Sequence, residues 1–257
     1  METLSALMFE LANVDRLEIL HELEKESMKL TSISKKLDLT MQETSRHLQR
    51  LCDAYLTEKR ADGEYHITRY GVGVLSLLPG LEFLVENREY FVSHRIDHLP
   101  REFIVRIGAL QGSQLLDNPV LAFQKVNTII EDAKEEVSFV SDQVPTGTIP
   151  LFESAVKRGL TMRTLMPESM GRPDLPESYL PHYDEADMEH MLLGRSESIA
   201  FVGVISEKAA VIGFPTIEGK MDYMAFHTKN DVGRRWCNDL FMYYWSQVEQ
   251  VHPSTES

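Results

Sequence analysis

The chain has 257 residues, of which 43% are hydrophobic and 26% charged, a composition typical of a folded protein with room for two small domains. It has no apolar run of the roughly 18 residues that a membrane-spanning helix needs, and its acidic start lacks the basic residues of a secretion signal. Cys52 and Cys237 lie far apart in sequence and form neither a metal-ligand spacing nor a disulfide framework, so we expect a cytoplasmic protein. No metal, cofactor or membrane partner is expected.

The net charge of −14 argues against nucleic acid as a partner, because an acidic surface repels phosphate. The charge is unevenly distributed, however. Residues 28–70 contain eight basic and six acidic side chains, within a chain that is otherwise strongly acidic. A local basic face in this segment is therefore compatible with double-stranded DNA as a partner.

Apolar residues at spacings of three and four predict helices over residues 5–26 and 31–37, and a third helix that begins at Leu39-Thr40. Thr40 and Glu43 have the Ser/Thr-x-x-Glu spacing of a capping box, in which each side chain accepts a hydrogen bond from the other residue's backbone amide. The third helix is therefore expected to start sharply at this point.

Residues 55–60 and 64–68 are predicted to form two short strands, and the Asp62-Gly63 pair between them is a strong hairpin signal. The order helix, helix, turn, helix, hairpin is that of a winged helix-turn-helix. In helix-turn-helix proteins the second helix of the motif enters the major groove of DNA. We expect residues 1–70 to form such a domain.

The solvent-facing side of the third helix carries short polar and basic side chains, as a helix in the major groove requires. Arg46 suits a bidentate contact with guanine, and Gln42 or Gln49 suits adenine. Thr40 and the first helical amides suit a backbone phosphate, whereas His47 is expected either to pack or to contact phosphate. The predicted DNA-binding residues are Thr40, Gln42, Ser45, Arg46, Gln49 and Arg50 on the helix, and Lys59 and Arg60 at the hairpin.

The stretch from Leu37 to Leu51, with the pattern Leu-x-Leu-Thr…Ser-Arg-His-Leu-x-Arg-Leu, resembles the helix-turn-helix of the ArsR-like winged-helix regulators of archaea and bacteria. The resemblance implies a homodimer that reads a pseudo-palindromic operator. Metal-sensing members of that family use Cys and His ligands, but Cys52 has no cysteine nearby. Metal sensing is therefore not expected here.

Between the two predicted domains, residues 68–94 and 99–110 have helical patterning, which Pro79-Gly80 interrupts. Turn-forming residues over 111–119 indicate a domain linker. We therefore expect residues 71–118 to be a helical linker and dimerisation segment.

Strands and helices alternate in residues 119–252, which indicates an α/β domain with a parallel sheet. A long loop is predicted over residues 168–183. The whole chain is thus expected to be α+β, with an N-terminal winged helix-turn-helix and a C-terminal α/β sensor domain. The predicted helices are 120–134, 149–158 and 231–250, and the predicted strands are 136–141, 160–166, 188–193, 198–205, 209–215 and 223–227.

Three segments of this second domain resemble the methanogenesis-regulatory C-terminal domain of euryarchaeal transcription regulators. They are Ala133–Val137, Ile217–Tyr223 and Arg235–Trp245. The resemblance implies an archaeal transcription regulator whose C-terminal domain senses a signal or assembles subunits.

The order of elements is also similar to the phospholipase D-like fold, whose active members need two His-x-Lys-x4-Asp motifs. His227-Thr228-Lys229 begins such a motif, but Arg234 occupies the Asp position and no second His-x-Lys occurs. We therefore expect no enzyme activity. His227 then either simply ends a strand, with Asp231 capping the last helix, or lies near a ligand pocket at the carboxyl ends of the strands. The predicted residues of that pocket are Ser141, Asp142, Arg195, His227 and Lys229.

The favoured hypothesis is a homodimeric, sequence-specific transcriptional regulator whose second domain binds an unknown small-molecule effector or mediates assembly. A winged-helix module that binds protein instead of DNA is the alternative, because of the acidic net charge. An enzyme with a DNA-targeting domain is the third hypothesis. The acidic run Asp184–Asp187, with His182 and His190, is interpreted as a loop and not as a metal site.

Overall fold

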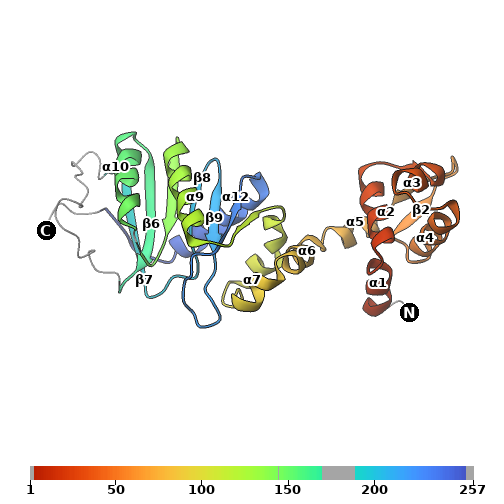
Figure 1. Ribbon diagram of the computed structural model, residues 1–257, viewed down its shortest axis with the longest axis horizontal. Coiled ribbons are helices and arrows are strands. Elements are labelled where there is room, and N and C mark those ends of the chain that lie inside the picture. The colour runs from red at the N-terminus through yellow and green to blue at the C-terminus, as the bar shows by residue number, and fades with distance from the viewer. Residues whose placement is uncertain (1–2, 144, 170–188, 253–257) are drawn as a thin grey trace. The chain divides into compact units, whose positions relative to one another are not determined.

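The computed structural model describes residues 3–143, 145–169 and 189–252, which form two compact units, Met1–Pro79 and Gly80–Ser257 (Figure 1). The α+β fold class is confirmed, since the first unit combines helices with a small sheet and the second surrounds a large sheet with helices. We expected residues 71–118 to link the two domains, whereas in the structure the boundary between the two units falls between residues 79 and 80.

The start of a new helix at Pro79 explains where the boundary falls. Proline suits the first position of a helix and disfavours helical backbone in the residue before it, so the helical stretch expected over 68–94 is broken. Beyond this point Phe83 and Tyr90 are buried in the core of the second unit, so the stretch does not behave as a linker. The segment contains α5 (Arg69–Leu75), α6 (Pro79–Glu86) and α7 (Arg88–Ser93).

In the first unit, two helices replace the single helix expected over residues 5–26: α1 (Leu4–Leu11) and α2 (Val14–Lys25). The cause is Asn13, whose side-chain oxygen accepts a hydrogen bond from the Arg16 amide at 3.0 Å and starts a new helix. The later elements follow the prediction closely. They are α3 (Leu30–Lys36), α4 (Met41–Asp53), β2 (Thr57–Lys59) and β3 (Glu64–Ile67), to which the structure adds β1 (Met28–Lys29), paired with β3.

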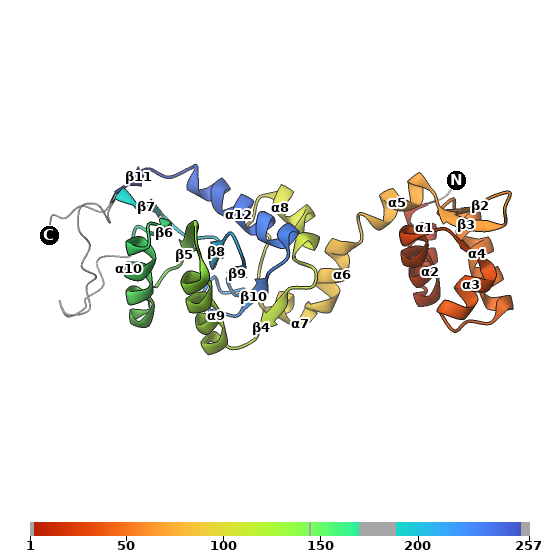
Figure 2. The ribbon, with the colours of Figure 1, turned by 90° about the horizontal axis from the view of Figure 1, so that it is seen from above.

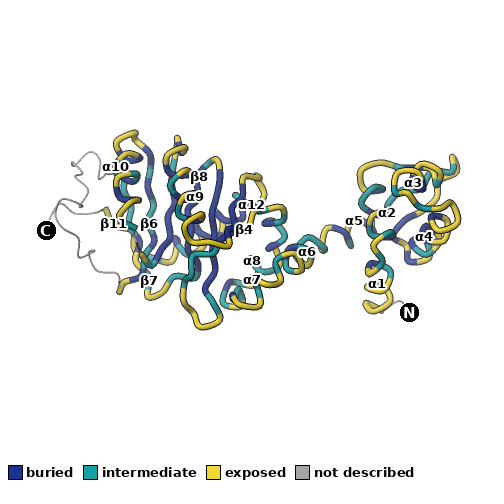
Figure 3. Tube along the Cα trace, viewed as in Figure 1, coloured by how far each residue is buried: buried dark blue, intermediate teal, exposed yellow. Residues whose placement is uncertain are grey.

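The core of the first unit is formed by apolar residues at the helical spacings that predicted the helices. Leu20 of α2, Leu48 and Leu51 of α4, and Leu56 before β2 are all completely buried. Figure 3 shows buried, dark blue stretches alternating with exposed ones along the elements of this unit. Burying side chains of this size contributes about 1.5–3 kcal/mol each. The packing therefore fixes α4 by one face and leaves its other face to solvent.

The second unit is built on a mixed sheet, which among the described residues has eight strands. The expected parallel pairing is confirmed for β5, β6 and β7 and is wrong for the rest, because β8 runs antiparallel to β5, β9 to β8 and β10 to β9. Residues 207–209, which join β8 to β9, are too few for a parallel crossover. The strand order is β11 (Gln250–Val251), β7 (Met191–Ser196), β6 (Thr161–Pro167), β5 (Glu136–Val140), β8 (Val202–Ser206), β9 (Ala210–Gly213), β10 (Ala225–Thr228) and β4 (Gln114–Leu116).

Helices cover both faces of this sheet. Figure 2 shows α9 (Pro119–Asp132) and α10 (Ile149–Lys157) on one side and α12 (Asp231–Trp245) on the other. Trp236 and Phe241 of α12 are completely buried, so these aromatic residues belong to the core. The same core includes residues of α6, α7, α8 (Arg101–Val105) and the 3-10 helix η1 (Ile107–Leu110), while the shorter η2 (Thr146–Thr148) precedes α10.

The expected linker at 111–119 contains β4, which forms an edge of the sheet by pairing with β10. A strand of three residues has too little alternation to be recognised from sequence. Most of the loop predicted over 168–183, as well as His182 and the acidic run 184–187, lies outside the described residues.

Candidate nucleic-acid interface

The predicted capping box at the start of α4 is confirmed. The Thr40 hydroxyl accepts a hydrogen bond from the Glu43 amide at 3.2 Å, and a Glu43 carboxylate oxygen accepts one from the Thr40 amide at 3.0 Å. The Ser34 hydroxyl also donates to the carbonyl of Leu39 at 2.6 Å, which fixes the turn between α3 and α4. These contacts and the buried leucines hold α4 as a rigid element.

The side of α4 that faces solvent carries four of the predicted base-reading residues. Gln42, Ser45, Arg46 and Gln49 are all exposed, whereas Thr44, Leu48 and Leu51 are buried. Gln49 donates to the Asp53 carboxylate at 2.8 Å. Within the described part of the chain Arg46 makes no hydrogen bond or ion pair, so its guanidinium is available to a ligand.

Thr40 lies at the N-terminus of α4, where a phosphate contact was predicted. Its hydroxyl is already engaged, because it also donates to the Glu43 carboxylate at 2.7 Å. The hydrogen bonds from Thr40 hold the pKa of Glu43 below its ordinary value, so the carboxylate stays charged. A phosphate at this helix end would meet that negative charge, and Thr40 therefore acts as a cap in this structure.

Arg50 differs from Arg46, because an intramolecular ion pair holds its guanidinium. Its Nε and Nη2 atoms donate to the two Glu10 carboxylate oxygens at 2.9 and 2.5 Å, and the guanidinium lies 5.3 Å from the centre of the Phe9 ring. Arg16 also contacts Glu10, with 3.2 Å between its Nε atom and the carboxylate. The contact ties α4 to the end of α1, which local spacing did not predict.

Replacing Glu10 by glutamine is expected to lower the melting temperature of the first unit by a few degrees at neutral pH. The hydrogen bond from Arg50 holds the pKa of Glu10 below its ordinary value of 4.5. The ion pair therefore stabilises the fold above that pH, and its contribution is lost as the pH falls through the folded pKa.

Thermal unfolding of the wild type, Glu10→Gln and Glu18→Gln across acidic pH checks this expectation. Glu18 is an exposed carboxylate on α2, so it controls for the loss of one charge. As the pH falls, the melting temperature of Glu10→Gln should decrease less than that of the wild type. Equal melting curves for all three proteins would show that the pair contributes nothing.

His47 packs inside the first unit, which decides between the two predicted roles. It is 4% exposed, and its Nε2 atom lies 3.4 Å from the Asp15 carboxylate. Burial lowers its pKa, so the neutral ring is favoured at physiological pH. His47 therefore packs on the buried side of α4.

The hairpin of β2 and β3 forms the predicted wing. The Arg60 amide donates to the Glu64 carbonyl at 2.7 Å, and Gly63 at the turn has a φ of +85°, a backbone conformation that glycine adopts without strain. Lys59 and Arg60 are exposed, and the Lys59 ammonium lies 5.5 Å from the centre of the Tyr65 ring. Both side chains are free of acidic partners among the described residues.

The second unit separates the residues that were predicted to share one pocket. Ser141 and Asp142 follow the carboxyl end of β5, but β10 runs antiparallel to β5, so Lys229 lies beyond the other end of this strand pair. His227 is in the same cross-sheet row as Phe139 and lines a different cavity from Ser141. Arg195 is on β7, with β6 between it and β5. The prediction of a single pocket at the carboxyl ends is wrong for His227 and Lys229.

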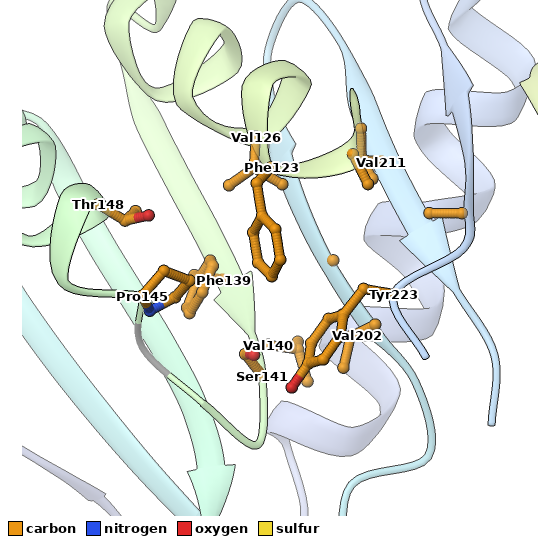
Figure 4. A pocket seen from close by; sticks show the side chains of 13 residues that line it. Phe123, Val126, Phe139, Val140, Ser141, Pro145, Thr148, Val202, Val211 and Tyr223 are labelled. Carbon is orange, nitrogen blue, oxygen red and sulfur yellow. The ribbon is translucent and has the colours of Figure 1, made fainter. Parts of the chain in front are cut away.

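Beside Ser141 and Asp142 is a narrow apolar pocket with a cavity volume of about 30 Å³ (Figure 4). The Tyr223 hydroxyl donates to the Asp142 carboxylate at 2.5 Å, and the Phe123 ring points into the pocket from α9. Burial and the neighbouring Asp142 raise the pKa of Tyr223. A cavity of this size holds only about one or two water molecules, so Tyr223 or Phe123 would have to move for a ligand to enter.

The structure also bears on metals and membranes. Within the described ranges no group of three or more His, Cys, Asp or Glu side chains could hold a metal ion. In the same ranges no helix is long and apolar enough to cross a membrane.

The capped turn before α4, the exposed face of α4 and the β-hairpin together define the first unit as a winged helix-turn-helix. Residues 16–85 match the family model for the winged helix-turn-helix, while no curated protein matches the chain. The chain is similar to TrmBL2, an archaeal chromatin protein whose structure is described as showing a novel mode of DNA binding. The two chains are 12% identical, the match covers 93% of this chain and 94% of that chain, and the TM-score is 0.45. It is also similar to Nuc, a phospholipase D family member from Salmonella typhimurium, with 13% identity, 51% and 91% covered, and a TM-score of 0.33. Likeness at this level carries no statement about activity.

Proposed function

We propose that the first unit binds duplex DNA in a sequence-dependent way and that the protein is a transcriptional regulator. The observation that carries this proposal is the solvent-facing side of α4, where Arg46 is exposed and unpaired among the described residues and Gln42 and Gln49 flank it. A helix with this composition suits the donor and acceptor pattern of the major groove. The exposure of Lys59 and Arg60 on the neighbouring wing supports a contact of these side chains with phosphate.

Ion pairs within the chain further define the DNA-binding face that we propose. Of the eight basic residues in 28–70, Lys36 pairs with Glu22 at 2.5 Å and Arg50 pairs with Glu10. The other six make no ion pair within the described residues, and they are Lys29, Lys35, Arg46, Lys59, Arg60 and Arg69.

Recognition by one winged helix reads few base pairs, and we propose that the protein acts as a homodimer, as the ArsR-like resemblance implies. Exposed apolar side chains at the start of the chain support this proposal, because Leu4 and Phe9 of α1 and Val14 of α2 are 69%, 64% and 68% exposed. Large apolar side chains exposed together mark a protein contact. A second copy that buries some of these side chains would place two recognition helices on a pseudo-palindromic site.

The second unit is proposed to bind a small-molecule effector without catalysing a reaction. The interrupted His-x-Lys motif supports the absence of catalysis, because Asp231 is exposed and pairs with Arg234 at 3.2 Å. Effector binding would regulate DNA binding only if the effector favours one conformation of the protein over another.

Fluorescence anisotropy with a labelled duplex from the protein's own upstream region tests the proposal. We expect binding to weaken steeply with salt, because log K falls by about 0.9 per log unit of salt for each neutralised phosphate. A protein-interaction module, which the acidic net charge favours, would leave the duplex unbound at low salt.

A further inference from the structure

A hollow in the second unit is not explained by DNA binding. It lies at the end of the sheet where β8 and β10 finish, and its cavity volume is about 160 Å³. Basic side chains converge on it from α9, from the turn between β8 and β9, and from the end of β10. The polar and basic side chains in its wall include Lys125, Thr128, Ser206, Lys208, His227 and Lys229.

His227 is the buried polar group of this hollow. The residue is only 8% exposed, yet it lines the cavity, and its ring nitrogens form no hydrogen bond with any described residue. Burial, followed by the charges of Lys125 and Lys229, lowers the pKa of His227. A neutral imidazole still offers one N–H donor, so the hollow contains a preformed donor that the protein does not use.

Lys125 and Lys229 are the two uncompensated charges beside this ring. Neither lysine forms an ion pair within the described residues, although Lys36 and Lys157 each pair with a carboxylate. Lys208 behaves differently, because its ammonium donates to the main-chain oxygen of Asp132 at the end of α9. A chain with a net charge of −14 therefore keeps two cations unpaired around a buried histidine.

The hydroxyl groups in the wall are already engaged. The Thr128 hydroxyl donates to the Gln124 carbonyl at 3.0 Å, and the Ser206 side-chain oxygen accepts hydrogen bonds from the amides of Lys208 and Ala209 at 3.2 and 3.3 Å. The donors available to a ligand are therefore Lys125, Lys229 and His227. Three donors on two elements suit an anion with three exposed oxygen atoms better than they suit a carboxylate.

We propose that this hollow binds the phosphoryl group of a small molecule through Lys125, His227 and Lys229. The inference deepens the proposed effector-binding role of the second unit and rests on it. Both inorganic phosphate and a phosphorylated metabolite present the same group, and the cavity admits the group itself. The remainder of a larger ligand would extend to solvent past the exposed Lys229.

Binding of a dianion would make protonation of His227 more favourable. The groups that face the ring are Lys125 on α9 and Lys229 on its own segment, with Lys208 and Asp132 also in the wall of the hollow. Because the two lysines now oppose protonation, a bound phosphoryl group reverses their effect and the complex takes up a proton. The contribution of His227 to affinity is therefore expected to rise as the pH falls through the region of an ordinary histidine pKa, while the phosphoryl group's own second ionisation acts in the opposite direction.

The test measures binding of inorganic phosphate to the full chain without DNA, by thermal shift and by titration calorimetry at constant ionic strength. We expect phosphate to raise the melting temperature in a dose-dependent way and acetate not to do so. The double variant Lys125→Ala/Lys229→Ala should bind phosphate at least tenfold more weakly. His227→Gln should change the pH profile of binding, leaving only the part that the titration of phosphate itself produces. A matched control is Lys220→Ala/Arg101→Ala, which removes two exposed charges that do not line the hollow.

The inference is overturned if phosphate does not stabilise the wild type, if acetate does so equally, or if the Lys125/Lys229 variant binds phosphate as tightly as the control. A glycerol phosphate titration distinguishes the two sources, since tighter binding than inorganic phosphate favours a phosphorylated metabolite. DNA binding of the same double variant is measured separately. Retained DNA binding with lost phosphate binding separates this inference from the proposed DNA-binding function.

Discussion

Replacing Arg46 by alanine is expected to weaken binding to the specific duplex about ten- to a hundredfold and to leave the melting temperature unchanged. The guanidinium is exposed on α4, and its removal breaks no hydrogen bond or ion pair among the described residues. A bidentate contact with a base is worth about 1–3 kcal/mol, which gives this loss of affinity. Anisotropy titrations with specific and scrambled duplexes measure the effect.

Two further arginine variants serve as comparisons for Arg46→Ala. Arg88→Ala removes one exposed charge from the second unit and should leave DNA affinity as in the wild type. Arg50→Ala breaks the ion pair with Glu10, so its effect on binding should accompany a lower melting temperature. If Arg46→Ala binds the specific duplex like the wild type, then α4 does not read bases through this residue.

The second large effect is expected for Gly71→Ala, which should destabilise the winged helix-turn-helix by about 3 kcal/mol. A β-carbon at Gly71 would lie 2.3 Å from the Leu56 carbonyl oxygen and 2.7 Å from the Ile67 side chain. The Leu56 carbonyl cannot move freely, because it accepts a hydrogen bond from the Thr68 amide at 3.0 Å. The wing would therefore have to separate from α5.

Gly73→Ala is the matched control, because it makes the same chemical change two residues further along α5. A β-carbon at Gly73 would meet no atom within 4 Å, and alanine favours helix over glycine by about 1 kcal/mol. We expect Gly73→Ala to be neutral or stabilising, whereas Gly71→Ala should lower the first unit's unfolding transition and, with it, DNA binding. Equal stability of the two variants would contradict the packing of α5 against the wing.

Local chemistry made the first unit predictable. The capping box of Thr40 and Glu43 and the Asp62-Gly63 turn each depend on residues only a few positions apart, and both are present in the structure. By contrast, the pair of Glu10 and Arg50 joins residues 40 positions apart, so no local spacing reveals it. Arg50 was therefore predicted to contact DNA, whereas in the fold its guanidinium is held by α1.

In the second unit the strands were recognisable but their directions were not. The pattern of a buried strand is the same in both directions, and because β10 runs antiparallel to β5, His227 lines a different cavity from Ser141. The strands β1, β4 and β11 have only two or three residues, too few to show a period. Tyr223 and Lys125 were missed because tertiary packing alone brings them to the two pockets.

The central claim is that the first unit reads a DNA sequence, and a salt series of anisotropy titrations tests it most directly. The wild type is titrated with a duplex from its own upstream region and with a scrambled duplex of equal length. We expect the upstream duplex to bind more tightly at every salt concentration, both affinities to fall steeply with salt, and the scrambled duplex to bind weakly because the rest of the chain is acidic. No binding at low salt, or equally tight binding of both duplexes, would contradict the claim.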